Sequence, residues 1–188
     1  MRPGAGGALE LLDASAQARF TRGGYLWPEM VDPASMLQGR TRETKIRRDA
    51  EGRWFNDGVE LTHPLLKQAF DRWLIRAPDG SGRYCLSNDI NWAYVAVEGA
   101  PRFVRKVSMT DGGVRLTLSD ESEVPLDPST LRQTADGALY CTVQDGLVAR
   151  FDRHAMMQLA SQIEEDEAGV YLALGSEIVR PPLVDDPG

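Results

Sequence analysis

The chain has 188 residues, of which 42% are hydrophobic and 26% are charged, as in folded globular proteins of one or two domains. This composition excludes a disordered chain and a collagen-like repeat, and no run of about 18 apolar residues suggests a membrane-spanning helix. The formal net charge of −7 disfavours nucleic acid and anionic lipid surfaces as partners, because like charges repel.

The chain is expected to begin with an N-terminal arm, residues 1–38, which has a Gly-rich start and a short helix near residues 8–20. This start lacks the apolar core of a secretory signal, so a cytoplasmic location is expected. In such a reducing compartment Cys85 and Cys141 would be free thiols. We expect both to be small buried residues in strands, because neither has a base or a second thiol nearby in the sequence.

After Gly39 the pattern changes to short strands separated by turn signals, among them five Asp-Gly pairs. Glycine tolerates the positive φ of tight hairpin turns. The pair Asp111-Gly112 has regularly alternating flanks and predicts a β-hairpin. The alternating positions are Val104, Lys106 and Ser108 before the turn, and Val114, Leu116 and Leu118 after it.

Two segments have the apolar stripe of an amphipathic helix. The first begins at Thr62-His63-Pro64, with a capping Thr or His and a proline in the first turn, and is predicted to end near Ile75. The second follows Asp152, a good N-cap residue, and is predicted to continue to Ile163.

The apolar stripe of the first helix recurs 90 residues later in the second helix, and the flanking strands recur at offsets of 85 to 88. The sequence therefore predicts a duplicated turn–strand–strand–helix–strand unit; chance similarity of two α+β units is the alternative. The predicted fold is α+β, with two related lobes that each pack a small antiparallel sheet on one helix. The predicted lobes are residues 39–128 and 129–183, followed by a flexible tail, 184–188.

Several stretches also resemble a known family. Residues 46–74 combine a distinctive turn and strand with the first helix. The turn and strand read Asp49-Ala50-Glu51-Gly52-Arg53-Trp54-Phe55; later come Gly82-Arg83-Tyr84-Cys85-Leu86, Val97-Glu98-Gly99-Ala100-Pro101 and Asp145-Gly146-Leu147-Val148-Ala149-Arg150. Together they resemble the bacterial domain-of-unknown-function family 1285, over residues 39 to about 180. The resemblance implies a two-lobed α+β fold with internal repeats, and no established activity, cofactor or catalytic residue.

The motifs of common catalysis are missing from the sequence. It has no Gly-x-Ser-x-Gly elbow, phosphate loop or dinucleotide fingerprint, and its only two histidines, His63 and His154, lie at predicted helix starts. We therefore predict no catalytic residue, cofactor or metal site, and interpret the acidic run 164–167 as a solvated loop. Whether the protein is an enzyme stays open; the alternative is a hydrolase that uses Glu98 with His63 across the groove between the lobes.

A strip of five cations between residues 40 and 48 stands out in this acidic chain; it comprises Arg40, Arg42, Lys45, Arg47 and Arg48. Such residues could contact phosphates, but no aromatic platform accompanies them in the sequence. We interpret the strip as a solvated strand edge whose charges oppose aggregation.

A second basic cluster, Arg150, Arg153 and His154, lies beside the predicted start of the second helix. The helix dipole already places about half a positive charge there, so cations are disfavoured unless an anion binds among them. Pairing of the arginines with Asp145, Asp152 or solvent is the alternative. Mainly because the residues of common catalysis are missing, we expect a ligand- or protein-binding module with a signalling or regulatory role; a purely structural or interaction protein is a third alternative. Its partner would be a small anionic ligand or a protein; nucleic acid and membrane are not expected, and homo-oligomers stay open.

Overall fold

The computed structural model describes residues 41–88, 90–111, 113–175 and 177–187. All of them belong to one compact unit that spans Asp32–Gly188. The predicted N-terminal arm and Arg40 therefore lie outside the described residues.

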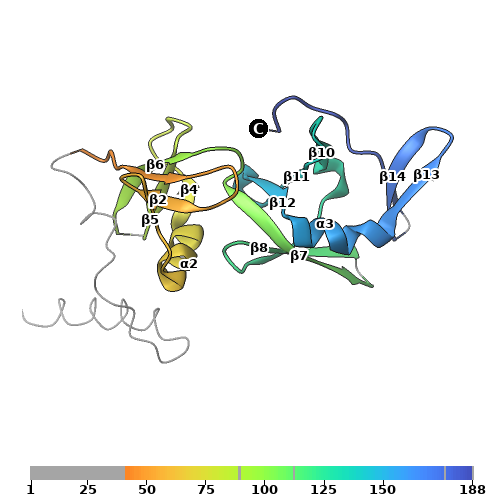
Figure 1. Ribbon diagram of the computed structural model, residues 1–188, viewed down its shortest axis with the longest axis horizontal. Helices are drawn as coiled ribbons and strands as arrows, with labels where there is room; N and C mark the ends of the chain where they lie inside the picture. Colours follow the sequence, from red (N-terminus) through yellow and green to blue (C-terminus); the bar gives the residue numbers. More distant parts are fainter. Residues whose placement is uncertain (1–40, 89, 112, 176, 188) are drawn as a thin grey trace, which may run out of the picture. The chain divides into compact units, whose positions relative to one another are not determined.

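The first lobe is built on a six-stranded sheet with the order β3-β2-β1-β6-β5-β4 (Figure 1). Neighbouring strands are antiparallel except for β1 and β6, which run parallel and make the sheet mixed. The strands are β1 (Ile46–Arg48), β2 (Trp54–Asn56), β3 (Val59–Glu60), β4 (Leu74–Arg76), β5 (Tyr84–Ser87) and β6 (Trp92–Val97).

Helix α2 (Pro64–Trp73) connects β3 to β4 and begins where the sequence predicts. The side chain of His63 caps it, because Nδ1 accepts a hydrogen bond from the Leu66 backbone N–H at 3.4 Å. The helix packs on the sheet through Phe70, which is fully buried and meets the ring of Trp54 edge-on at 5.3 Å. It ends two residues before the predicted Ile75, since Leu74 and Ile75 already belong to β4.

The second lobe has a six-stranded sheet with the order β10-β11-β12-β7-β8-β9, in which β12 and β7 run parallel. Short 3₁₀ turns lie before β10 and between β11 and β12. The strands are β7 (Arg102–Thr110), β8 (Gly113–Leu118), β9 (Glu123–Pro125), β10 (Arg132–Gln133), β11 (Leu139–Thr142) and β12 (Val148–Phe151), and the turns are η2 (Pro128–Thr130) and η3 (Gln144–Gly146).

The predicted hairpin is confirmed as β7 and β8, but its alternation is wrong along part of β7. The register shifts between Val104 and Lys106, so Arg105 is the extra residue of a β-bulge. Two consecutive residues, Arg105 and Lys106, are consequently exposed, and Val107 takes the next buried position. A bulge restores the apolar face one residue later than strict alternation predicts.

The second helix, α3 (Arg153–Leu159), begins at the predicted position, where Asp152 Oδ1 accepts a hydrogen bond from the Ala155 backbone N–H at 2.8 Å. It is shorter than predicted, because a 3₁₀ turn, η4 (Ala160–Gln162), leads directly into β13 (Ile163–Asp166). No helix in the described ranges is long and apolar enough to cross a membrane.

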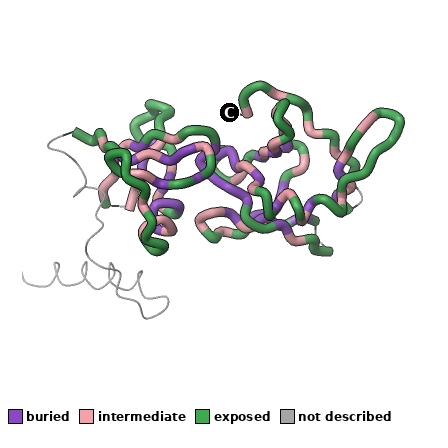
Figure 2. The backbone as a smooth tube through the Cα atoms, in the orientation of Figure 1, coloured by how far each residue is buried: buried purple, intermediate pink, exposed green. Residues whose placement is uncertain are grey.

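Strand β13 forms a separate antiparallel sheet with β14 (Gly169–Leu174) and β15 (Glu177–Val179). Most of the acidic run therefore lies in a strand rather than in the predicted loop. All four residues of β13 are exposed, as Figure 2 shows for this hairpin, so the run is solvated as expected.

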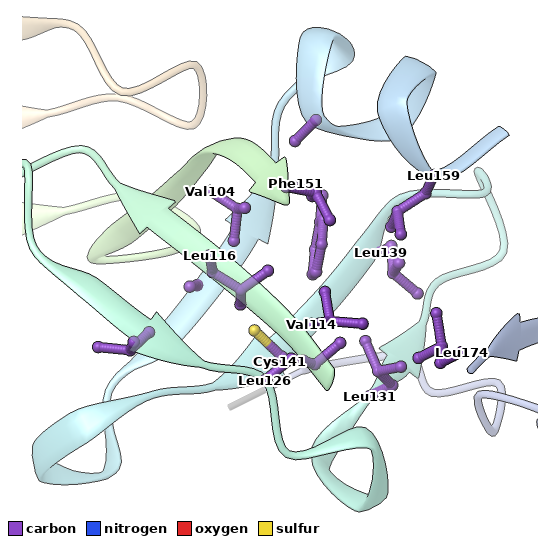
Figure 3. Close-up of a cluster of buried hydrophobic side chains, with 14 of the residues drawn as sticks. Val104, Val114, Leu116, Leu126, Leu131, Leu139, Cys141, Phe151, Leu159 and Leu174 are labelled. Carbon is purple, nitrogen blue, oxygen red and sulfur yellow. The ribbon is translucent and has the colours of Figure 1, made fainter. Parts of the chain in front are cut away.

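The main apolar cluster lies in the second lobe, between its sheet, α3 and the inner side of β14 (Figure 3). Most of its members come from strands, mainly at alternating positions, and others come from one face of the helix and from the connection between β9 and β10. They include Val104, Leu116, Leu131, Leu139, Cys141, Phe151, Leu159 and Leu174.

The predicted duplication is confirmed by the repeated topology. The order β1-β2-β3-α2-β4-β5-β6 recurs as β10-β11-β12-α3-β13-β14-β15. The parallel contact between the two ends of the unit also recurs. In the first lobe β1 pairs with β6. In the second lobe Gln133 of β10 forms a parallel bridge with Leu183, shortly after β15. The remaining strands, β7–β9, lie within the range predicted for the first lobe, 39–128. They belong to the sheet of the second lobe, which they join through the pairing of β7 with β12. The protein is thus a two-lobed α+β fold.

Candidate functional site

A groove of about 200 Å³ lies where the turn between β1 and β2 meets β7, β12 and the start of α3. Three arginines dominate its lining. The lining residues are Glu51, Phe103, Arg105, Arg150, Phe151, Asp152 and Arg153.

Strand pairing explains why residues so far apart in sequence line one groove. Because β12 runs parallel to β7, Arg150 lies directly opposite Phe103. The bulge in β7 then exposes Arg105 next to them, and bulges commonly redirect a side chain in this way. Arg153 follows as the first residue of α3.

The three guanidinium groups differ in their partners. Arg105 Nη1 lies 3.3 Å from Asp152 Oδ2, while the other oxygen of that carboxylate caps α3. Arg150 Nη1 donates a hydrogen bond at 3.1 Å to the backbone carbonyl of Ala50, a neutral acceptor. Within the described ranges, no ion pair joins Arg150 or Arg153 to a carboxylate. Two cations therefore line the groove without a salt bridge, although the charge of Arg150 helps to lower the pKa of Asp136, which is outside the lining.

Of the three residues in the predicted basic cluster, the structure brings Arg150 and Arg153 to the groove. His154 does not line it, and its Nε2 lies 3.2 Å from the amide nitrogen of Gln158, one turn along α3. The sequence interpretation missed Arg105, whose only signal is the pair of adjacent charged residues 105 and 106 inside an apolar strand.

A buried charge network lies behind the groove. Arg48 is fully buried, with its guanidinium carbon 4.9 Å from the centre of the Phe103 ring and 5.2 Å from that of Trp54. Its Nη1 donates to the carbonyl of Pro101 at 2.7 Å, and its Nη2 lies 3.0 Å from Asp71 Oδ1. Burial lowers the pKa of Arg48 to about 10, and burial also raises the pKa of Asp71.

A second arginine joins this network to the other lobe. Arg102, at the start of β7, donates to the backbone carbonyls of Asp71 and Leu74 at the end of α2. Its Nη2 also lies 3.3 Å from Asp120, in the turn after β8. Strand β7 of the second lobe is therefore attached to the helix of the first lobe by side-chain hydrogen bonds.

The structure corrects the interpretation of the basic strip. Strand β1 is not an edge, because β2 pairs with one side of it and β6 with the other, and Arg48 is inside the core. Aromatic residues do accompany the strip, but from other strands: Arg42 stacks on Trp92 and Arg47 on Phe55, each at 4.0 Å from the ring centre. Such partners cannot be found by reading the strip alone.

The alternative catalytic pair, His63 and Glu98, is not joined in the structure. His63 caps α2, and Glu98 forms an exposed ion pair with Arg47 at 3.6 Å. No hydrogen bond or ion pair between the two is present in the described part of the chain.

A second groove, of about 380 Å³, lies on the first lobe. Its charged groups satisfy one another: Arg83 makes two hydrogen bonds of 2.7 Å to Glu43 and lies 3.5 Å above the Tyr94 ring. The Tyr94 hydroxyl also donates to Asp79 and lowers the pKa of that carboxyl to about 2. This groove offers no free charge comparable to those of Arg150 and Arg153.

Both cysteines are buried free thiols, as expected. Burial raises the pKa of Cys85 to about 11 and that of Cys141 to about 12, so the reactive thiolate is scarce at neutral pH. Among the described residues, no group of three or more His, Cys, Asp and Glu side chains could hold a metal ion.

No protein-family model matches the chain, and no curated protein matches it. Solved structures do. A DUF1285 family protein from Silicibacter pomeroyi DSS-3 is 19% identical, with a TM-score of 0.59 over 89% of this chain and 93% of that one. A DUF1285 family protein from Shewanella baltica OS155 is 20% identical, with a TM-score of 0.50 over 63% of this chain and 91% of that one. The resemblance read from the sequence is thus confirmed in the fold: the chain has the two-lobed α+β fold of DUF1285 family proteins.

Proposed function

We propose that the protein is a binding module for a small anionic ligand, which Arg150 and Arg153 hold in the groove. The observation that supports this most directly is that Arg150 and Arg153 line one groove and neither forms a salt bridge with a described carboxylate. Arginine guanidinium groups bind carboxylates and phosphates through paired, charge-assisted hydrogen bonds.

The groove favours recognition of charge over recognition of a ring. Its volume of about 200 Å³ suits a small molecule. The two phenylalanines in the lining, Phe103 and Phe151, are each only 3% exposed, so their faces are not free for stacking. The helix start contributes little, since α3 has only seven residues and Asp152 already caps it. We therefore propose that the ligand is recognised mainly through the charges of the arginine side chains.

Thermal unfolding in phosphate and in chloride at matched ionic strength tests the proposal. A ligand at about 100 times its dissociation constant stabilises the folded state by about 2.7 kcal/mol, which raises the melting temperature by about 5–10 °C for a chain of this size. The double variant Arg150→Ala, Arg153→Ala should lose this increase. Arg115→Ala is the matched control, because Arg115 is exposed on β8 and outside the groove.

Equal melting temperatures in phosphate and chloride would contradict the proposal. So would an increase in phosphate that survives the double substitution. The hydrolase alternative has less support, because His63 and Glu98 are each engaged by another residue.

A further inference from the structure

We propose that the ligand of this groove is a zwitterion, with its anionic group on Arg150 and Arg153 and its cationic group at Glu51. This inference rests on the proposed anion binding and adds the chemical class of the ligand. The observation behind it is that the carboxylate of Glu51 lines the groove but forms no ion pair with the arginines there.

Glu51 lines the groove from the turn between β1 and β2, whereas the arginines belong to β7, β12 and α3. Its cationic partner is Arg53, on its own turn, with Nη2 3.3 Å from Oε2. Both side chains are more than half exposed, at 53% and 64%, and Arg53 Nε lies closer to Asp49 Oδ2, at 2.7 Å, so the ion pair of Arg53 with Glu51 is weak. No ion pair in the described chain joins Glu51 to an arginine of the groove. Charges of opposite sign therefore line the same space without contact.

The turn that carries Glu51 is held in place by its neighbours. Asp49 Oδ1 accepts hydrogen bonds from the backbone N–H groups of Glu51, at 3.1 Å, and Arg53, at 2.8 Å. Arg150 itself donates to the carbonyl of Ala50 in this turn. The backbone that carries Glu51 is thus already fixed beside Arg150 before a ligand binds. This reduces the conformational entropy lost on binding.

The charge balance of the lining then favours one class of ligand. Arg105 and Asp152 form an ion pair with each other, which leaves Arg150, Arg153 and Glu51 to meet the ligand. A simple anion would satisfy the arginines but would lie in the same groove as a carboxylate that repels it. A ligand that also carries an ammonium group converts this repulsion into an attraction.

Two matched pairs of probes test this. Phosphoethanolamine and ethyl phosphate differ in the ammonium group, as do γ-aminobutyrate and butyrate. Titration calorimetry at one low ionic strength should show that the wild-type protein binds the zwitterion of at least one pair about threefold to fivefold more tightly, the effect expected of one exposed ion pair. The pair that shows the preference identifies the anionic group.

Glu51→Gln should abolish the preference and should raise the affinity for the simple anion. Glu123→Gln, an exposed glutamate of β9 outside the groove, should change neither. If the zwitterion and the simple anion bind equally to the wild type, or if the preference survives Glu51→Gln, this inference is wrong while the anion site stands. If none of the four probes binds, both this inference and the proposed function are wrong.

Discussion

Arg48 and Asp71 form an ion pair inside the core, where each charge has lost most of its water. Arg48 is fully buried, and within the described residues its Nε and Nη2 have no hydrogen-bond acceptor of good geometry. Asp71 Oδ1 also accepts a hydrogen bond from the Trp54 indole N–H at 3.0 Å. Such a pair stabilises little by itself, but removal of one partner leaves an uncompensated charge.

Substitution of Arg48 by Met should therefore cost about 3–5 kcal/mol of unfolding free energy at pH 7, because Asp71 loses its buried counter-charge. The double variant Arg48→Met, Asp71→Asn should recover part of this loss. Denaturant unfolding of the wild type, both single variants and the double variant measures the coupling. A loss of less than about 1 kcal/mol in Arg48→Met would show that the pair is not a buried one.

The same variant has a predicted pH dependence. Burial raises the pKa of Asp71 in the folded protein. At pH values between the unfolded and the folded pKa, the folded state therefore binds more protons than the unfolded state. Stability due to this group is therefore highest below the unfolded value of about 3.9 and falls as the pH rises through the folded value. Loss of Arg48 removes an attraction that lowers the pKa of Asp71, so the folded pKa should be raised further in Arg48→Met. This variant should therefore recover stability relative to wild type as the pH falls from neutral towards the unfolded pKa. The double variant Arg48→Met, Asp71→Asn should not recover stability in this way, because it has no carboxyl group at position 71.

The turn between β1 and β2 connects the core network to the groove. Gly52 has a φ of +82°, and a Cβ atom there would lie 2.8 Å from the Phe103 ring. Only glycine fits both the left-handed backbone and the ring packed against it. The turn therefore sets the position of Phe103, and with it one side of the groove.

Gly52→Ala should destabilise the protein more than Gly58→Ala. Gly58 has a similar φ of +81°, but a Cβ atom there would meet no other atom within 4 Å, so its substitution reports backbone strain alone. We expect each substitution to carry about 1–3 kcal/mol of strain, with about 1–3 kcal/mol more at Gly52 from the clash with Phe103. If both variants lose the same unfolding free energy in denaturant, the Phe103 ring moves away from the added Cβ atom without an energetic cost.

In each copy of the repeated unit, the end of the unit pairs with its first strand. In the first lobe β6 pairs with β1 over two positions, Arg47 with Ala96 and Arg48 with Val97. In the second lobe this contact is reduced to one bridge, in which Gln133 donates to Pro182 at 3.0 Å and accepts from Val184 at 2.8 Å. The C-terminal segment is thus part of the second lobe's architecture.

Truncation after Arg180 should destabilise the protein by about 1–3 kcal/mol, the sum expected for two backbone hydrogen bonds. Truncation after Asp186 keeps both bonds and is the matched control. Thermal unfolding of the two truncated proteins measures the difference. If both truncated proteins have the melting temperature of the full-length protein, the bridge does not contribute to stability.

The features that depend on local spacing could be predicted from the order of the residues alone. The starts of α2 and α3 follow from a capping residue and an apolar stripe, the β7–β8 hairpin from its turn, and the duplication from the recurrence of these signals. Arg150 and Arg153 also stood out locally, as cations at a helix start. Each of these signals depends on residues within a few positions of one another, where backbone geometry dictates the pattern.

The contacts that these residues make depend on long-range strand pairing and could not be predicted from local patterns. The parallel pairing of β1 with β6 turned a predicted strand edge into a core strand and buried Arg48. The pairing of β7 with β12 and the bulge at Arg105 then placed Arg105 beside Arg150, across from the turn of Glu51. Parallel partners lie about fifty residues apart in this chain, and their register is set by how apolar faces pack rather than by any local pattern.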